Sequence, residues 1–523
     1  MKPFLMYKDS DFDLQQNLPW NEQDLTQDLE LNTLFNAMAL DDEFLFDVAR
    51  KAILGGFGND LDTIRYRQNI LKDCLKNPDI VRDIYAIAVE SIKREKKDYW
   101  GFFSKHPSTI LYRSIEVMQM FVQMLRRLRN IADEQAGEFR SKGFMALFDM
   151  LRKELDDEYF AGVHDHLKTL KFSDGILISA ELGKGNKGAN YILCKPQSEK
   201  RGWIQRLFSH LSFESEAVRA IDRWVHKMFA KEPPHSFYID PRDESGARAL
   251  SELRDRGINL VANALAQSTD HILNFFILLR SELAFYLGCL NLHATLAQME
   301  APVSFPRPEA AGDRKHSFQG LYDVCLALRM KQKVVGNDVI ADHKDLIIIT
   351  GANQGGKSTF LRSIGLSQLM MQCGMFVPAE SFCANLCNQL FTHFRRKEDT
   401  TMESGKLDEE LSRMSEIVDY ITPTSMVLFN ESFAATNERE GSEIARQIIS
   451  ALLEKHVKIF SVTHLYEFAH AFYDNKIENA IFLRAERQND GTRTFRLIES
   501  KPLQTSYGVD LYKQIFVPAK PNT

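Results

Sequence analysis

The stretch LIIITGANQGGKSTF, residues 346–360, decides the fold of the C-terminal part of the chain. It opens with an apolar run typical of a buried β-strand and leads directly into a glycine-rich loop that ends in Lys357, Ser358 and Thr359. Apolar residues from Phe360 to Met371 recur at helical spacing, so a helix is predicted after the loop. A strand, a glycine loop and a helix in this order predict a phosphate-binding site.

The loop matches the pattern G-x-x-x-x-G-K-[ST], and its chemistry requires these residue types. Glycines let consecutive backbone N–H groups point at one anion, and the following helix presents its positive N-terminal end. Lys357 is expected to reach the β- and γ-phosphates, and the Ser358 hydroxyl is expected to ligate Mg²⁺. A chance glycine-rich turn is the alternative, and the flanking strand and helix patterns disfavour it. The predicted nucleotide-binding residues are Gly351, Ala352, Asn353, Gln354, Gly355, Gly356, Lys357, Ser358 and Thr359.

Length and composition set the limits for the rest of the chain. A chain of 523 residues is too long for one core, so two to four domains are expected. The 65 basic and 71 acidic residues give a net charge of −6, which excludes a uniformly basic nucleic-acid coat but permits local basic patches. Seven scattered cysteines indicate reduced thiols, and Cys383 and Cys387 lack a second ligand pair at zinc spacing.

No targeting signal is visible in the sequence. The first residues have no apolar signal core, and Arg280 and Glu282 interrupt the most apolar run, residues 271–290. That run is therefore interpreted as a buried helix rather than a membrane span. A cytoplasmic protein without a membrane partner is expected, associated with the nucleoid if the source is bacterial.

The composition and the hydrophobic periodicity of the sequence change several times along the chain. Residues 1–40 are polar and acidic with little periodicity, as in an arm. Helical periodicity with almost no Gly or Pro then predicts a helical lever, interrupted by two alternating runs around a Gly-Asn-Lys-Gly tip that predict a hairpin within residues 173–196. Alternating strands and helices from about residue 316 predict an α/β domain with a mostly parallel sheet. The expected parts are an arm at 1–40, a helical core at 41–172, a β insertion at 173–242, a returning helix at 243–300 and the α/β domain at 301–523.

Two further strands in the α/β domain end in polar residues. SMVLFNES, residues 425–432, ends in Asn430 and Glu431, and KIFSVTH, residues 458–464, ends in His464. An Asn-Glu pair at a strand end is often a turn, and a histidine there is often structural. Because three strand ends of a parallel sheet meet in one crevice, we favour a site in which Glu431 activates water and His464 contacts the γ-phosphate. Asn430 stands where an Asp of the Mg²⁺ shell is expected.

These motifs resemble the ATPase domain of the MutS family, which is a branch of the ABC-type ATPases. The similarity is carried by GANQGGKST, GMFVPAES (374–381), LFNESFAATNEREG (428–441), VTHLYEF (462–468) and TSYGVDL (505–511), in the family's order and spacing. LDTIRYRQNILKDCLKNP (61–78) resembles the start of the family's helical core, and the order helix, β insertion, helix resembles its lever arms and DNA clamp.

The resemblance implies roles for individual residues. Lys357 and Ser358 would bind the phosphates and Mg²⁺, Glu431 would be the catalytic glutamate and His464 the switch histidine. Thr436 and Asn437 fall in the loop that crosses to the partner subunit. The segment MESGKLDEELSRMSEI keeps Ser404, Gly405 and Lys406 of the family's signature but lacks its Ser-Thr-Phe, so the residue that touches the partner's γ-phosphate is not defined.

The resemblance also implies partners. ABC-type ATPases close two nucleotides between two subunits, so ATP, Mg²⁺ and a homodimer are expected. No Phe-x-Glu wedge of the mismatch reader stands among the first forty residues and no nuclease-like tail follows, so a short form without the reader is expected.

Basic residues gather in and after the predicted hairpin. Backbone phosphates of double-stranded or branched DNA are the expected ligands, although a solvated hairpin has the same charge. The candidate DNA-binding residues are Lys184, Lys187, Lys195, Lys200 and Arg201. A second cluster, KREKKDYW at 93–100, is interpreted as an exposed helix face.

Two functions remain open from the sequence. The first is an ATP-dependent DNA clamp in repair or recombination, reset by hydrolysis. The second is a nucleotide-gated dimeric scaffold with little turnover, because Asn430 weakens Mg²⁺ handling. Glu431 and His464 favour the first.

Overall fold

A computed structural model describes residues 1–99, 106–172, 176–182, 188–194, 244–396, 405–488 and 490–504. The chain divides into two compact units. Unit 1 consists of Met1–Pro3, Asp79–Arg140 and Phe144–Arg280, and unit 2 consists of Phe4–Pro78, Ser141–Gly143 and Ser281–Thr523. Unit 2 is therefore assembled from three separate parts of the sequence.

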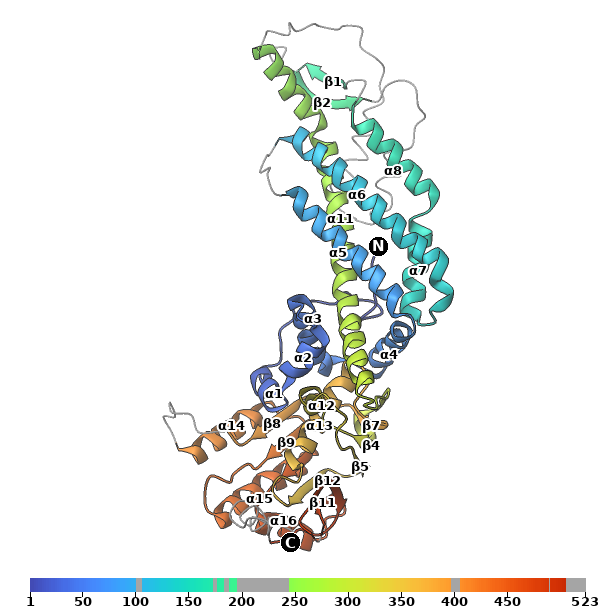
Figure 1. The fold of residues 1–523 in the computed structure, drawn as a ribbon. Coiled ribbons are helices and arrows are strands. Elements are labelled where there is room, and N and C mark those ends of the chain that lie inside the picture. Colours follow the sequence, from blue (N-terminus) through green and yellow to red (C-terminus); the bar gives the residue numbers. More distant parts are fainter. Residues whose placement is uncertain are drawn as a thin grey trace, which may run out of the picture. The chain divides into compact units, whose positions relative to one another are not determined.

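Unit 1 is built from long amphipathic helices (Figure 1). Their apolar stripes supply a continuous core that includes Phe121, Leu125 and Phe276. The helices are α5 (Pro78–Tyr99), α6 (Pro107–Gln135), α7 (Lys142–Glu154), α8 (Asp157–Leu170) and the first part of α11 (Glu244–Gln298).

The predicted hairpin is confirmed in unit 1. Strand β1 (Leu177–Leu182) pairs antiparallel with β2 (Gly188–Cys194), with Leu177 opposite Cys194. The tip of the hairpin and all five candidate DNA-binding residues lie outside the described residues.

The centre of unit 2 is a six-stranded sheet in the order β12-β11-β6-β10-β9-β8. All neighbouring pairs are parallel except β11 and β12. The predicted strands appear at the expected places, because their uninterrupted apolar runs are buried on both faces. The strands are β6 (Leu346–Gly351), β8 (Leu390–Phe394), β9 (Met426–Asn430), β10 (Lys458–Val462), β11 (Ala480–Arg487) and β12 (Arg493–Glu499).

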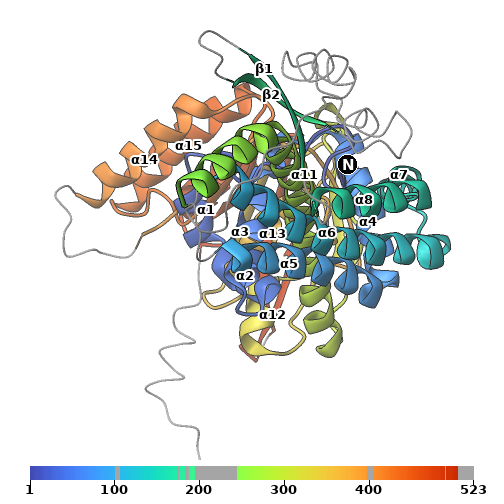
Figure 2. The ribbon, with the colours of Figure 1, turned by 90° about the horizontal axis from the view of Figure 1, so that it is seen from above.

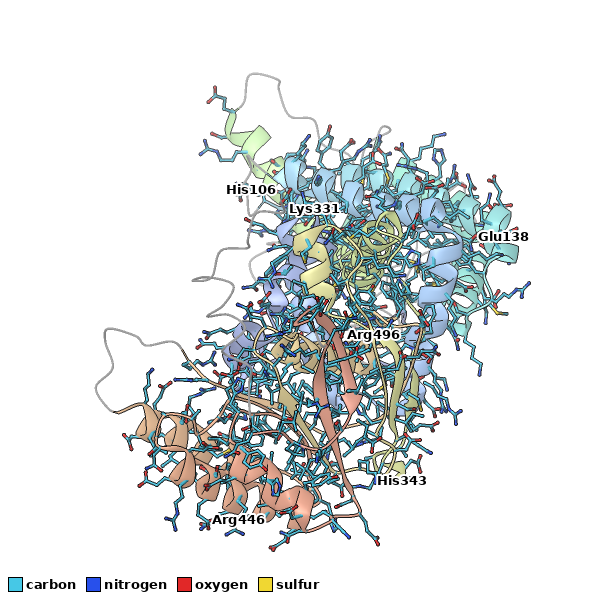
Figure 3. The ribbon with its side chains drawn as sticks, turned by 60° about the horizontal axis from the view of Figure 1, so that its bottom comes forward. His106, Glu138, Lys331, His343, Arg446 and Arg496 are labelled. Carbon is cyan, nitrogen blue, oxygen red and sulfur yellow. The ribbon has the colours of Figure 1, made fainter. Side chains whose placement is uncertain are left out.

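Helices cover both faces of this sheet. Alternate strand residues such as Val427 and Phe429 join one apolar cluster with α14 (Lys406–Tyr420), α15 (Glu438–Glu454) and α16 (Tyr466–Asp474). Figure 2 shows α14 and α15 on the same side of unit 2. The intervening Leu428 faces α13 (Lys357–Gln372) on the opposite side. Charged residues lie on the outer face of α15, where Arg446 (labelled in Figure 3) pairs with Glu443 at 2.6 Å.

A second, four-stranded sheet in the order β3-β7-β4-β5 completes the α/β part of unit 2. Its strands are β3 (Arg307–Glu309), β4 (His316–Leu321), β5 (Asn337–Ile340) and β7 (Ser381–Asn385), and the short helix α12 (Val324–Met330) follows β4. His316 of β4 is fully buried among Phe318, Phe382 and Phe460.

The first forty residues are more ordered than their polar composition predicts. They form α1 (Glu22–Asp28) and α2 (Leu31–Ala39), and they continue into α3 (Glu43–Leu54) and α4 (Leu61–Lys76). The apolar residues are few but well placed, since Leu25, Leu34 and Phe35 are all fully buried in unit 2. Asn21 donates to the carbonyl oxygen of Leu390 at 2.8 Å, which satisfies a free acceptor on the edge strand β8.

Residues Phe4–Tyr7, here called the strap, are held by buried and partly buried polar side chains of unit 2. The carboxylate of Glu282 accepts from the N–H groups of Leu5 at 2.5 Å and Met6 at 3.3 Å. The strap carbonyls of Phe4, Leu5 and Met6 accept from Tyr66, Tyr286 and Arg67, at 2.6, 2.5 and 2.8 Å respectively. Each backbone group named here is thus paired inside the protein, as buried backbone requires.

Helix α11 is long and apolar enough to meet a length and composition test for a membrane span. Its apolar window lies within Arg248–Gln298 and is 72% buried inside the protein. Because Glu282 on this helix holds the strap, the helix is packed as a core element over this region.

Candidate nucleotide-binding site

The glycine-rich loop turns tightly between β6 and α13. Gly351 and Gly356 have φ values of 104° and 86°, a region that only glycine adopts readily. A Cβ atom on Gly351 would lie 2.9 Å from the backbone nitrogen of Ala485, so the neighbouring strand β11 also excludes a side chain there. Backbone conformation and close packing therefore both account for the glycines of the motif.

Lys357, the first residue of α13, points back over the loop. Its Nζ donates to the carbonyl oxygens of Gly351 and Ala352 at 3.0 Å each, and the residue is only 5% exposed. Burial lowers the pKa of Lys357 to about 8, with Glu431 opposing the shift. The ammonium group is thus held beside the concave face of the loop, where a bound anion would raise its pKa again.

Ser358 and Asn430 meet at the ends of α13 and β9. The Ser358 hydroxyl donates to Asn430 Oδ1 at 2.8 Å. Hydroxyl and amide oxygens are ligands that suit Mg²⁺, so these two residues fit a hydrated Mg²⁺ ion, although neither brings a negative charge. Among the described residues no cluster of three His, Cys, Asp or Glu side chains is arranged to hold a metal.

Glu431 and His464 follow the adjacent strands β9 and β10 and form a direct pair. Glu431 Oε1 lies 2.8 Å from His464 Nε2, and both side chains are about one-third exposed. The hydrogen bond from His464 is the main cause of a lowered pKa of Glu431, which stays a carboxylate near neutral pH. A carboxylate at the open end of the sheet, oriented by a second group, has the arrangement of a general base.

The turn that carries Glu431 has an unusual backbone. Glu431 and Phe433 have φ values of 55° and 62°, and the Glu431 N–H donates to the carbonyl oxygen of Val462 at 2.9 Å. Non-glycine residues in this region are strained and persist only when the surrounding structure holds them. We call residues Glu431–Phe433 the catalytic turn, after the role that we propose for Glu431 below.

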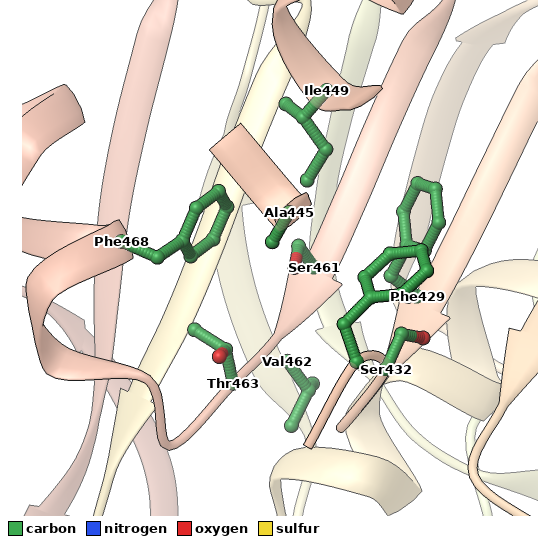
Figure 4. A pocket seen from close by; sticks show the side chains of 9 residues that line it. Phe429, Ser432, Ala445, Ile449, Ser461, Val462, Thr463 and Phe468 are labelled. Carbon is green, nitrogen blue, oxygen red and sulfur yellow. The ribbon is translucent and has the colours of Figure 1, made fainter. Parts of the chain in front are cut away.

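A small apolar cavity lies behind the catalytic turn (Figure 4). It is bounded by the ends of β9 and β10 and by α15 and α16. The residues that line it are Phe429, Ser432, Phe433, Ala445, Ile449, Ser461, Val462, Thr463 and Phe468.

Other residues singled out in the sequence take separate places. Asn437 caps α15 by accepting from the N–H of Glu440 at 3.0 Å, and Thr436 donates to the Glu440 carboxylate at 2.6 Å. Gly405 is the N-cap of α14 and Lys406 is its first residue. Ser404 and the TSYGVDL motif lie outside the described residues.

Arg493 is a site residue that the sequence motifs did not reveal. Its Nε donates to the carbonyl oxygen of Asn353 in the loop at 3.2 Å, and its charge lowers the pKa of Lys357. Arg493 begins β12, which is 140 residues away from the loop along the chain. Only the sheet topology, in which β12 pairs with β11 and β11 pairs with β6, could have placed it there.

The strand–loop–helix unit, followed by polar residues at neighbouring parallel strand ends, defines a mixed α/β domain of a nucleotide-binding type. Comparison with family models identifies the family to which this domain and the helical part are similar. The model for the MutS2 N-terminal domain matches residues 59–299, and the model for MutS domain V matches residues 347–521. The chain belongs to the MutS family.

Relatives that share this similarity are DNA mismatch repair proteins named MutS. The protein from Leuconostoc citreum is 29% identical over 268 residues, covering 48% of this chain and 31% of the relative. The protein from Lactobacillus gasseri is 27% identical over 393 residues, covering 69% of this chain and 45% of the relative. The chain therefore matches less than half the length of these relatives.

Proposed function

We propose that this protein is an ATP-hydrolysing, DNA-binding member of the MutS family, acting in DNA repair or recombination. The observation that carries the proposal is the convergence of five side chains at one end of the sheet: the loop lysine Lys357, the Ser358–Asn430 pair and the Glu431–His464 pair. In this reading the loop binds the phosphates, and Glu431 accepts a proton from the attacking water while His464 holds its carboxylate.

Mg²⁺ bound with ATP would neutralise charge that develops on the phosphates. Ser358 and Asn430 would hold it, partly through water. We further propose that the protein acts as a homodimer in the cytoplasm, with double-stranded or branched DNA as its partner.

Measuring ATP turnover with and without duplex DNA tests the proposal directly. Turnover that DNA changes by severalfold would support it. ATP binding without turnover under either condition would favour the second candidate, a nucleotide-gated dimeric scaffold. The observation that favours this alternative is Asn430, which leaves the metal position without the negative charge that an Asp would supply.

Asn430 provides the first prediction. Replacing Asn430 with Asp adds a charge 2.8 Å from Ser358 Oγ, so the Mg²⁺ concentration for half-maximal binding of a fluorescent ATP analogue should fall about threefold or more. The measurement is a Mg²⁺ titration that needs no turnover. An unchanged or raised requirement would mean that another carboxylate already occupies that position.

The second prediction concerns DNA. Replacing Lys184 and Lys187 with Glu should weaken binding to every duplex about equally and reduce the slope of log affinity against log salt by about 2, because each phosphate contact releases about one counterion. The matched control is Lys93 and Lys96 replaced by Glu, the same charge change on the exposed face of α5. Equal loss in both variants would show that the effect is only net charge.

A further inference from the structure

His393 lies one residue before the end of β8 and is fully buried. It connects two elements through its ring. Nδ1 lies 2.7 Å from the hydroxyl of Ser432, in the catalytic turn, and Nε2 lies 2.9 Å from the carbonyl oxygen of Glu410, in α14. The imidazole also stacks on Phe433, with ring centroids 5.1 Å apart. One side chain thus touches both residues that follow Glu431 and the helix α14.

His393 and Ser432 together carry too few protons to form all three hydrogen bonds around the ring at once. The Glu410 carbonyl can only accept, so Nε2 must carry a proton to bond it. The Ser432 hydroxyl also lies 2.5 Å from the carbonyl oxygen of His393 and can donate its single proton there. The bond between Ser432 and Nδ1 then requires a proton on Nδ1, in addition to the proton on Nε2. Burial lowers the pKa of His393 to about 4, so the ring is neutral and carries one proton at neutral pH. Two of the three bonds can therefore form at one time.

Glu410 adds a second connection between α14 and the catalytic turn. Its side chain is buried, and its carboxylate accepts from the backbone N–H of Phe433. The other carboxylate oxygen, Oε2, has no hydrogen-bond partner within the described part of the chain. Ser432 and Phe433 also line the small cavity of Figure 4, so the packing around the catalytic turn is incomplete.

We propose that His393 is a positioning residue that couples α14 to the catalytic turn. With its proton on Nε2 it holds α14, and Ser432 turns to Nδ1; with its proton on Nδ1 it holds Ser432 and releases the Glu410 carbonyl. The orientation of the Glu431 carboxylate then depends on the position of α14. This helix begins at Lys406, one of the three residues that match the family's signature. This inference rests on the proposed ATPase function and adds a residue to it.

The two ring nitrogens can be separated by substitution. His393→Asn keeps a polar atom near the position of Nδ1 and loses the bond to α14. His393→Gln reaches toward Glu410 and loses the bond to Ser432. His393→Phe keeps the ring stacking on Phe433 and loses both bonds. The matched control is His316→Phe, a fully buried histidine whose ring nitrogens have no hydrogen-bond partner among the residues that the structure describes.

We expect His393→Phe to lower kcat for ATP about tenfold, with the dissociation constant for a fluorescent ATP analogue unchanged within twofold. His393→Asn and His393→Gln should each recover part of this loss, and His316→Phe should retain kcat. Equal loss of kcat in His393→Phe and His316→Phe, or equal kcat in His393→Phe and the parent, would overturn the inference.

Hydrogen exchange gives a readout that does not need hydrolysis. Binding of a non-hydrolysable ATP analogue with Mg²⁺ should slow exchange in peptides covering both 406–420 and 426–434 of the parent. In His393→Phe the two peptides should no longer respond together. A coupled response in that variant would refute the role of His393. A parent that binds ATP and shows this coupled response without turnover would contradict the proposed hydrolysis but retain the coupling, so the two failures are distinguishable.

Discussion

Replacing Glu431 with Gln is expected to lower ATP turnover by about a hundred- to ten-thousand-fold while leaving ATP binding within about twofold. Glutamine keeps the size of the side chain and can still contact His464, but it cannot accept a proton from water. Steady-state phosphate release and equilibrium binding of a fluorescent ATP analogue measure the two effects separately. Turnover within twofold of the parent would remove Glu431 from the role of general base.

The matched control for this substitution is Glu454→Gln, which makes the same change at an exposed position at the end of α15. It should leave turnover unchanged. The Glu431→Gln variant also tests the proposed homodimer. Because the variant binds ATP without hydrolysing it, the closed dimer should accumulate. Light scattering that shows a monomer with ATP at every concentration, together with a fully active parent monomer, would contradict a site completed by a second subunit.

Replacing Gly441 with Ala is expected to destabilise the protein by about 1–3 kcal/mol and to lower turnover about ten- to hundredfold. Alanine favours a helix over glycine by about 1 kcal/mol, so the substitution would be stabilising on α15 alone. However, a Cβ atom at this position would lie 2.4 Å from the carbonyl oxygen of Phe433. Backbone cannot yield as a flexible side chain does, so the catalytic turn must move and the clash outweighs the gain in helix propensity.

Gly162→Ala on α8 is the comparison that isolates this clash. There the nearest atom to a new Cβ is Cε1 of His166 at 4.0 Å, so the substitution should stabilise by about 0.5–1 kcal/mol. Thermal unfolding and steady-state turnover of both variants are the measurements. A Gly441→Ala protein that is as stable and active as the parent would mean that the catalytic turn tolerates displacement.

The sequence was most informative where chemistry and burial impose the same pattern. The runs before Gly351, Asn430 and His464 are strands buried on both faces, so their apolar residues are uninterrupted and their ends are recognisable. Parallel strands end at one edge of a sheet, and for that reason three motifs far apart in sequence could be expected to converge. The hairpin was predictable from its alternation and its Gly-Asn-Lys-Gly tip.

Other features left no such pattern. Arg493 and His393 reach the site through the order of the strands, and neither belongs to a motif with fixed spacing. The first forty residues have too few apolar positions to show periodicity, yet Leu25 and Phe35 are buried because other parts of unit 2 supply the rest of the core. Composition alone cannot distinguish such a segment from an arm.

The strap has a consequence for how the chain is made. Leu5 and Met6 are fully buried, but Glu282 and Tyr286, which hold the strap, are synthesised more than 270 residues later. At about 5–20 residues per second, the ribosome needs roughly 10–40 s to pass from residue 79 to residue 280. Unit 1 can assemble during that interval, whereas the apolar side chains of the first helices must wait for those partners that come from the later part of unit 2. The start of unit 2 thus waits longer between its synthesis and its final packing than any later part of the unit, and a chaperone that covers it would act during that interval.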